Sequence, residues 1–437
     1  MSNISNKKII FPEGFLWGSA SASHQVEGNC THNQWWEFEQ QPGRIKAGDK
    51  SGIACDHYNR YEEDFNMLKA LNHNAHRISF EWSRFYPESP EELNKGAVEH
   101  YHKVLEKLIE LGIEPFVTTF HFTLPLWFAT KGGFEEYTNI KYYEKFCELL
   151  AKEYKGKIKY WNTINEPSVY AFMSYYLGEF PPAKKNLIEA LTVLKNLMKA
   201  HAKVYEIIKG EDDNNQVGLV KHMASFIARN KNNPFDRMAS SITDRVFNHT
   251  IIKALKTGDI AFPLGIFESC DYIKNSSDFI GLNYYTRKFC TLRNPGGFFT
   301  KTGDEKITKM GWTVFPEGIY HNLKILYKEL GLPLYITENG IATDDDKWKT
   351  EFIKIHLKEI HRSISEGIDV KGYFYWTNMD NFEWADGYGS NFGLIEIERE
   401  NNLNRKVRKS ALDYADIIKK NGFEVEYSPV KNNNIPR

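Results

Sequence analysis

Eight short runs of β-type residues alternate with amphipathic helical segments along the chain of 437 residues. This alternation predicts an α/β fold built on a parallel sheet. Several runs are almost continuously apolar, for example Phe279–Tyr285, as expected of parallel strands that are covered on both faces. Eight β/α units over this length favour a single (β/α)8 TIM barrel, whose active site lies at the carboxyl ends of the strands.

The expected elements follow one another along the chain, strand before helix. The strands are Phe15–Ala20, Ala75–Phe80, Pro115–His121, Ile158–Asn165, Val217–His222, Phe279–Tyr285, Leu334–Glu338 and Gly372–Thr377. The helices are Lys95–Leu111, Asn186–Lys209, Phe235–Lys256, Glu317–Leu330 and Lys347–Glu366. In the first helix, Val98, Leu105 and Leu108 fall near one face, so that face is expected to pack on the sheet.

A doubly wound nucleotide-binding fold shares this alternation but needs a phosphate-binding loop. Gly387–Gly393 resembles G-x-G-x-x-G, yet its third glycine comes one place late and no strand–helix unit frames it. His356–His361 does not have the spacing of a zinc helix, and His73 and His76 lack a carboxylate or cysteine partner nearby. We therefore expect the barrel, without a metal ion or an organic cofactor.

Composition indicates an ordinary globular protein with many aromatic residues. Lys and Arg total 56 and Asp and Glu total 57, a net charge of −1, which argues against a broad nucleic-acid or anionic-membrane surface. Aromatic residues make up 14% of the chain. Most belong to the core, and some are suited to line a pocket for a flat-faced ligand such as a sugar ring. No transmembrane run of apolar residues is found.

The cysteines and the N-terminus bear on the compartment and the domain organisation. The 5 cysteines are odd in number and form no Cys-x-x-Cys pair, so reduced thiols are expected. The polar start of the chain does not resemble a signal peptide, which favours the cytoplasm. No linker or repeat divides the chain, so residues 1–437 are expected to form one domain, with flexible tails at 1–8 and 429–437. These features do not distinguish a monomer from a homo-oligomer.

Two glutamates fall at the carboxyl ends of two expected strands in matching settings. Glu166 lies in Asn165–Pro167 and Glu338 in Thr337–Gly340, each after an apolar run and before a turn. One such glutamate alone is more often a cap or a salt-bridge partner. Two of them, each beside an asparagine, indicate chemistry on a glycosidic bond, which needs one protonated carboxyl group and one ionised carboxylate.

The motifs around these glutamates resemble those of glycoside hydrolase family 1, the retaining β-glucosidases and β-galactosidases. Phe11–Gly18 and Ser21–Gly28 resemble the family's opening, Asn165–Pro167 its acid/base motif, and Thr337–Gly340 its nucleophile motif. Tyr373–Trp384 resembles its glycone-binding loop. The resemblance covers nearly the whole chain and is nearest to the compact, archaeal-type members.

The resemblance implies that Glu338 is the nucleophile and Glu166 the general acid/base. It also implies that Arg77 and Tyr285 contact Glu338, and that Asn165 binds the sugar 2-OH. An arginine and a hydroxyl donor beside a carboxylate favour its ionised form. We therefore expect Glu338 to titrate low and Glu166, next to that negative charge, to titrate higher.

Sugar recognition is expected from polar groups and flat aromatic faces. By resemblance, Gln25 and Glu383 lie across the 4-OH, and His121 is a further hydroxyl partner. Trp376 and Trp384 offer faces against which sugar C–H groups pack.

Three more residues complete the expected site. Asn283 is expected to orient it, whereas Trp312 and Phe392 match positions that flank the aglycone entrance. The family's usual His-Trp-Asp-Leu-Pro is replaced here by His121–Pro125, in which Phe122 has no indole N–H. A hydrogen bond to the sugar 3-OH, and sharp selectivity for glucose, are not expected from this position.

These features predict an exo-acting, retaining β-glycosidase that acts on small-molecule β-glycosides, a β-glucosidase with β-galactosidase and β-fucosidase side activity. The carboxylate of Glu383 would repel a 6-phosphate, so unphosphorylated sugars are expected. One alternative is an endo-acting glycanase, which the expected closure of the non-reducing end by Gln25 and Glu383 disfavours. Another is a non-catalytic sugar-binding protein, which the presence of both glutamates disfavours.

Overall fold

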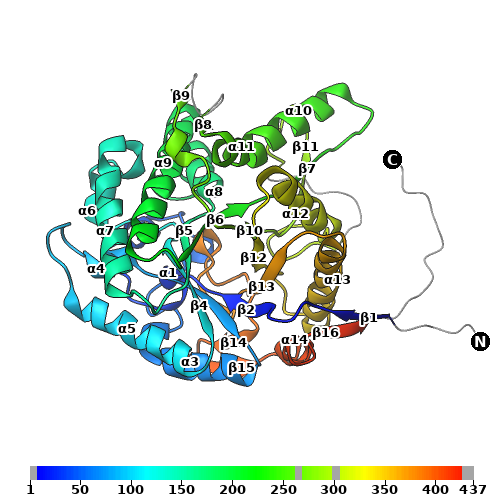
Figure 1. The fold of residues 1–437 in the computed structure, drawn as a ribbon, viewed down its shortest axis with the longest axis horizontal. Helices are drawn as coiled ribbons and strands as arrows, with labels where there is room; N and C mark the ends of the chain where they lie inside the picture. The colour runs from blue at the N-terminus through cyan, green and yellow to red at the C-terminus, as the bar shows by residue number, and fades with distance from the viewer. Residues whose placement is uncertain (1–6, 261–267, 298–305, 426–437) are drawn as a thin grey trace, which may run out of the picture.

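A computed structural model describes residues 7–260, 268–297 and 306–425. Its centre is a closed barrel of eight parallel strands in the order β2, β3, β4, β5, β6, β10, β12 and β13 (Figure 1). The strands are β2 (Leu16–Ala20), β3 (Ala75–Ser79), β4 (Glu114–Phe120), β5 (Tyr160–Asn165), β6 (Gln216–His222), β10 (Phe279–Asn283), β12 (Leu334–Asn339) and β13 (Val370–Trp376). β13 pairs with β2 and closes the barrel. The predicted fold is thereby confirmed.

Each predicted strand is present, and its ends differ from the prediction by at most 2 residues. The strand predicted over Phe279–Tyr285 ends earlier, at Asn283. There the pairing with β12 shifts register, and the amide of Tyr284 donates to the carbonyl oxygen of Glu338 at 2.9 Å. This bend leads the chain to Tyr285, at the barrel mouth.

Helices surround the barrel on its outside (Figure 1). The longer ones are α3 (His57–Ala70), α5 (Lys95–Glu110), α7 (Ile140–Glu153), α9 (Leu187–Glu211), α10 (Pro234–Asp244), α11 (Thr250–Thr257), α12 (Glu317–Leu330), α13 (Asp346–Ser365) and α14 (Lys409–Lys419). Side chains of Asn94, Asn186 and Asp345 cap α5, α9 and α13 by accepting backbone N–H groups. The helix predicted over Phe235–Lys256 is interrupted by a π-helical turn at Arg245–His249. This wider turn leaves the carbonyl oxygen of Phe247 to accept hydrogen bonds from side chains of neighbouring elements.

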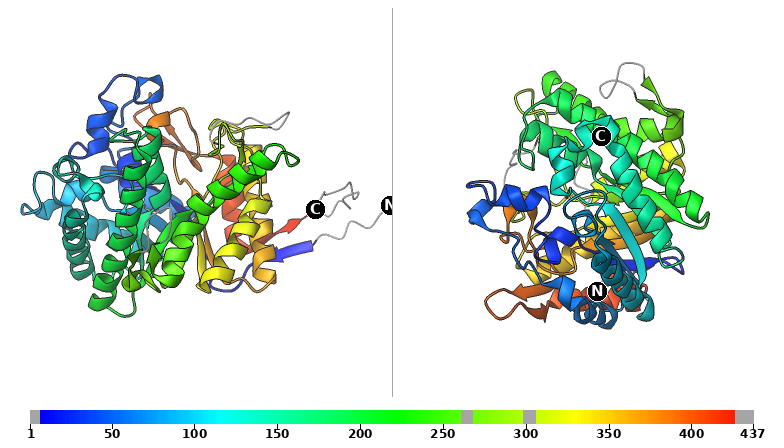
Figure 2. Two further views of the ribbon diagram at one scale, coloured as in Figure 1. Left: turned by 90° about the horizontal axis from the view of Figure 1, so that it is seen from above. Right: turned by 90° about the vertical axis from the view of Figure 1, so that its left-hand side faces the viewer.

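Short elements fill the connections. The short helices are α1 (Ser23–Val26), α2 (Gln34–Glu39), α4 (Trp82–Phe85), α6 (Leu126–Thr130) and α8 (Pro167–Phe172). The small two-stranded sheets pair β1 (Lys7–Ile10) with β16 (Gly422–Val425), β7 (Ser225–Ala228) with β11 (Arg287–Cys290), β8 (Asp259–Ile260) with β9 (Glu268–Ser269), and β14 (Ile395–Glu398) with β15 (Asn404–Val407). The β1–β16 pair brings the two ends of the described chain side by side at one edge of the molecule (Figure 2).

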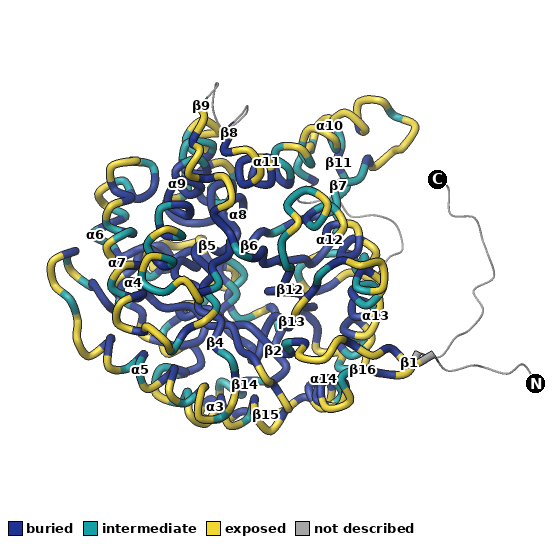
Figure 3. The backbone as a smooth tube through the Cα atoms, viewed as in Figure 1, coloured by how far each residue is buried: buried dark blue, intermediate teal, exposed yellow. Residues whose placement is uncertain are grey.

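The barrel interior is packed at the end where the strands begin. Phe116 stacks on Tyr160 with ring centroids 4.2 Å apart, and Tyr335 and Phe374 lie against Phe116 at 5.3 and 4.7 Å. The barrel strands are buried, and exposed residues lie on the outer helices and loops (Figure 3). These packed aromatic rings fill the barrel at the end where the strands begin. A site is therefore expected at the opposite end, where the strands finish.

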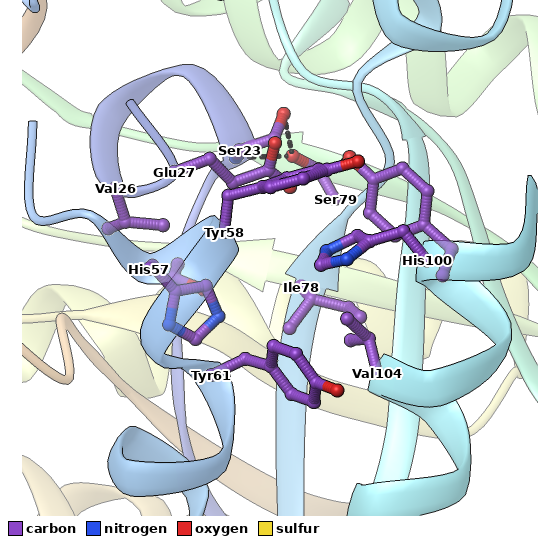
Figure 4. Close-up of a pocket in the computed structure, with 12 residues that line it drawn as sticks. Ser23, Val26, Glu27, His57, Tyr58, Tyr61, Ile78, Ser79, His100 and Val104 are labelled. Carbon is purple, nitrogen blue, oxygen red and sulfur yellow. Dashed lines mark hydrogen bonds between the residues drawn. The ribbon is translucent and has the colours of Figure 1, made fainter. Parts of the chain in front are cut away.

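A small pocket also lies outside the barrel, between β3, α3 and α5 (Figure 4). Inside it, Glu27 accepts from the hydroxyl of Tyr101 at 2.7 Å and from Arg84 Nε at 2.6 Å. It contains neither Glu166 nor Glu338, so it is separate from the predicted site.

Within the described ranges, no helix is long and apolar enough to cross a membrane. All five cysteines are buried and free.

Candidate active site

Glu166 and Glu338 lie at the carboxyl ends of β5 and β12. Glu166 follows β5 directly and precedes Pro167, the first residue of α8. Its φ of 45° lies in the left-handed region, and its amide donates to the carbonyl oxygen of Val220 in β6 at 2.9 Å. Both carboxyl groups are buried, since Glu166 is 6% exposed and Glu338 3% exposed. A non-glycine residue in this strained conformation, at a strand end, is typical of a functional position.

Arg77 and Tyr285 hold the two oxygens of Glu338. Arg77 Nη1 donates to Oε1 at 2.5 Å, and the Tyr285 hydroxyl donates to Oε2 at 2.6 Å. Arg77 is fully buried in β3 and also donates to Thr118 and, at 2.7 Å, to Asn165 Oδ1. The two expected neighbours of Glu338 are therefore in contact with it, one on each oxygen.

Two asparagines connect this group to Glu166. Asn165 Nδ2 donates to Nε2 of His121 at 3.1 Å, because its Oδ1 faces the donor-only Arg77. Asn283 Nδ2 donates to Glu166 Oε1 at 2.7 Å and lies 3.3 Å from Asn165 Oδ1. Both glutamates thus belong to one buried hydrogen-bonded network.

His222 is a neighbour of Glu166 that the sequence analysis missed. It is the last residue of β6, it pairs in register with Asn283 of β10, and its Nδ1 lies 3.2 Å from Glu166 Oε1. Its side chain is 14% exposed. The signal was present in the sequence, since the strand predicted over Val217–His222 ends in an ionisable residue at the end of the barrel where chemistry takes place.

Burial and different neighbours set the electrostatics of the two glutamates. Burial raises the pKa of Glu338 to about 7, and the guanidinium of Arg77 opposes that rise. Burial also acts to raise the pKa of Glu166, but the neighbouring His222, together with the hydrogen bonds from His222 and Asn283, brings that pKa below its ordinary value. Burial therefore opposes the low pKa expected of Glu338, and the contacts from His222 and Asn283 oppose the high pKa expected of Glu166.

Gln25, Glu383, His121 and Trp376 form a wall beside the reaction centre. Gln25 Nε2 donates to the carbonyl oxygen of Phe382 at 2.9 Å and lies 3.4 Å from Glu383 Oε2. Trp376 Nε1 lies 3.5 Å from the same carboxyl oxygen. Burial and, to a smaller extent, the negative charge of Asp386 raise the pKa of Glu383 to about 8.

Two buried polar atoms in this wall have no protein partner among the described residues, Oε1 of Gln25 and Nδ1 of His121. Since Nε2 of His121 accepts from Asn165, its proton lies on Nδ1. Burial and the nearby Arg77 hold the pKa of His121 well below its ordinary value, so the ring is neutral. One acceptor and one donor are thus left for a ligand's hydroxyl groups.

The aromatic residues border this wall on two sides. The ring of His121 lies nearly parallel to Trp376 and Trp384, with centroids 5.9 and 6.1 Å away. On the other side, Tyr285 contacts Trp312 at 5.4 Å and Phe392 at 6.1 Å. Through these contacts every predicted site residue joins one connected set. Among the described residues, no three His, Cys, Asp or Glu side chains are grouped as a metal site requires.

Comparison with known proteins agrees with this geometry. The model of glycosyl hydrolase family 1 matches residues 7–423. A solved β-glycosidase from Pyrococcus horikoshii is 40% identical, with a TM-score of 0.88 over 96% of this chain and 97% of its own. β-Glucosidase A of Thermotoga maritima is 32% identical over 95% of this chain and 99% of its own. A 6-phospho-β-glucosidase of Bacillus subtilis is 30% identical over 94% of this chain and 98% of its own.

The match extends over nearly the whole of these relatives and of this chain. It includes both strand-end glutamates, which lie inside the matched residues 7–423. The chain therefore belongs to glycosyl hydrolase family 1 and is a glycoside hydrolase of the β-glucosidase type.

Proposed function

We propose that the protein is an exo-acting, retaining β-glycosidase that removes terminal non-reducing β-D-glucosyl residues by double displacement. The observation that carries this proposal is the unequal setting of the two buried glutamates. Glu338 has a donor on each oxygen, Arg77 on Oε1 and Tyr285 on Oε2. Glu166 is held through Oε1 alone by Asn283 and His222, and no hydrogen bond from the described residues reaches its Oε2. The first setting orients a carboxylate for attack, and the second leaves Oε2 of Glu166 available to exchange a proton with the substrate.

In the first step, Glu338 attacks the anomeric carbon while Glu166 gives its proton to the departing oxygen. The C–O bond to the aglycone breaks, and an ester bond forms between Glu338 and the sugar. In the second step, Glu166 takes a proton from water, the water oxygen attacks the anomeric carbon, and Glu338 leaves as a carboxylate. Two inversions at one carbon retain its configuration.

The wall formed by Gln25, Glu383 and His121 supports recognition of the non-reducing sugar. Gln25 Oε1 is an acceptor without a protein partner among the described residues, and His121 Nδ1 is a donor without one. Trp376 and Trp384, which are 3% and 5% exposed, supply apolar faces for the ring. A wall that closes off this end of the sugar favours release from chain ends over cleavage within a chain.

We propose that the substrates are unphosphorylated β-glucosides, and that β-galactosides and β-fucosides are hydrolysed more slowly. In the described chain, the side-chain partners of the Glu383 carboxyl are Gln25 and Trp376, and neither is basic. A 6-phosphate there would meet a carboxyl group without a compensating cation. We also propose a cytoplasmic protein, since the five cysteines are free and a reducing compartment would keep them so.

The first experiment is proton NMR of the sugar released at early times from an aryl β-glucoside. β-Glucose should appear first and mutarotate later, whereas α-glucose first would rule out retention. Nitrophenyl β-glucoside, galactoside, fucoside and 6-phosphoglucoside are then compared by kcat/KM. A higher kcat/KM for the 6-phosphoglucoside would overturn the proposed substrate class. Release of internal fragments from cello-oligosaccharides would favour an endo-acting glycanase.

A further inference from the structure

His222 lies against Glu166 in a position that permits a direct effect on the acid/base. Its Nδ1 is 3.2 Å from Glu166 Oε1. The imidazole is nearly parallel to the ring of Tyr285, with centroids 6.0 Å apart, and the ring of Phe247 meets it edge-on at 5.8 Å. The π-helical turn of Arg245–His249 carries Phe247. Packing on two sides fixes the orientation of the imidazole toward the carboxyl group.

The titratable side chains around His222 come from four parts of the chain. Glu166 faces it from the end of β5, and Tyr285, after β10, lies beside it and donates to Glu338. Lys221, the preceding residue of β6, donates to the carbonyl oxygens of His222 and Phe247 at 2.6 and 2.8 Å. Burial lowers the pKa of Lys221 to about 7.

Asp244, at the end of α10, acts on Lys221 through its negative charge. Phe247, from the π-helical turn, presents only an apolar ring to the imidazole. Among these groups, Glu166 is the one whose ionisable atoms lie within hydrogen-bond distance of the imidazole of His222. A change in the charge of His222 therefore acts first on Glu166.

We propose that His222 is a positioning residue for the second step of the reaction: it donates Nδ1–H to Oε1 of Glu166 and keeps this carboxyl group ionised when it must accept a proton from water. The inference rests on the proposed role of Glu166. In the glycosyl-enzyme, Glu338 is an uncharged ester, so its charge no longer influences Glu166. His222 then determines the pH below which Glu166 is protonated and deglycosylation stops. The proton taken from water goes to Oε2, which lacks a hydrogen bond from any described residue.

The test uses His222→Asn, because an asparagine Nδ2 keeps a neutral donor near the place of Nδ1 and cannot become cationic. The measurement is kcat against pH for an aryl glucoside with a good leaving group, for which deglycosylation limits the rate. The acid limb of this profile should move to higher pH in the variant. On the acid side, each unit of displacement lowers kcat about tenfold. An acid limb at the same pH in wild type and variant would overturn the proposal.

A second measurement does not depend on the folding of that variant. The Nδ1–H proton of His222 is observed by NMR in the wild type and in Glu166→Gln, which replaces the charged acceptor by a neutral one. Its signal should lie further upfield in Glu166→Gln than in the wild type. Equal chemical shifts would show that the two groups do not interact and would also overturn the proposal.

A failure of the proposed function would give a different result from a failure of the proposal for His222. If Glu166→Ala hydrolyses all substrates as fast as the wild type, Glu166 is not the acid/base. If Glu166→Ala is impaired as expected but His222→Asn keeps the wild-type acid limb, only the role of His222 is wrong.

Discussion

The reaction centre and the sugar-binding wall lie side by side at the same end of the barrel, but their polar atoms are used differently. In the reaction centre, Arg77 donates to Glu338 Oε1 at 2.5 Å and to Asn165 Oδ1 at 2.7 Å. In the wall, Glu383 has long contacts of 3.4 and 3.5 Å, and Gln25 Oε1 has no partner among the described residues.

This difference shows which groups are organised before substrate arrives. Groups that act on developing charge are held in place by the protein, so no reorganisation is needed during the reaction. Groups that recognise hydroxyls keep unused hydrogen-bonding capacity, which the sugar fills. Substitutions in the reaction centre should therefore affect chemistry on all substrates, whereas substitutions in the wall should affect substrates according to their hydroxyl groups.

The largest effect is expected from Glu338→Gly. Removing the carboxylate leaves no group to form the glycosyl-enzyme, so turnover of every substrate should be abolished. Added azide should fill the space and attack from the same side, which gives an α-glycosyl azide from a β-glycoside with a good leaving group. NMR of the product is the measurement. Turnover by Glu338→Gly at the wild-type rate, or a β-glycosyl azide as the product, would contradict the nucleophile assignment.

The next effect is expected from Glu166→Ala, and it should depend on the leaving group. Poor leaving groups need the proton, so their kcat/KM should fall by about 10²–10⁴. Good leaving groups depart without it, so kcat/KM for a dinitrophenyl glycoside should change little. With azide, the product should be the β-glycosyl azide. An equal loss for good and poor leaving groups would show that Glu166 does not supply the proton.

The reaction centre was largely predictable from sequence, because strand ends in a barrel converge on one place. Glu166, directly after β5, and Glu338, in β12, were expected together for this reason, whereas the contact of Arg77 with Glu338 was implied by the resemblance to glycoside hydrolase family 1. The eight strands could also be predicted, since parallel strands buried on both faces give apolar runs. Their exact ends could not, because register shifts such as the one between Leu282 and Asn283 depend on the neighbouring strand.

What could not be predicted is the hydrogen-bonding state of each atom. The residue type does not say that Asn165 turns its oxygen to Arg77 and so fixes the tautomer of His121. Nor does it say that His222 reaches Glu166 and lowers the pKa of this carboxyl group, or that burial raises that of Glu338. These facts depend on contacts between side chains that are up to 261 residues apart in the sequence, as for Arg77 and Glu338.

A smaller effect is expected from Gln25→Met in the wall. The side chain keeps its length but loses the Oε1 acceptor and the contact with Glu383. For a β-glucoside, kcat/KM should fall by about tenfold or more, as for the loss of one or two hydrogen bonds in a buried site. The matched control is the 4-deoxy glucoside, which the variant and the wild type should hydrolyse with similar kcat/KM. A tenfold loss on both substrates would mean that Gln25 acts on the reaction centre and not on the 4-OH.

The smallest effect is expected on stability, from Glu383→Gln, and it should depend on pH. The folded protein raises the pKa of Glu383 from 4.5 to about 8. Between these values the unfolded chain has lost a proton that the folded protein still holds, so the wild type loses stability as the pH rises through this window. Glutamine is neutral in both states and has no such loss.

The melting temperatures of Glu383→Gln and wild type should therefore be similar at pH 4 and differ at pH 9, with the variant higher. All other titrating groups are the same in the two proteins and cancel in the difference. A difference that is constant between pH 4 and pH 9 would mean that the carboxyl of Glu383 titrates alike in the folded and unfolded chains. In that case burial would not raise the pKa of Glu383, although among the described residues no basic side chain contacts its carboxyl group.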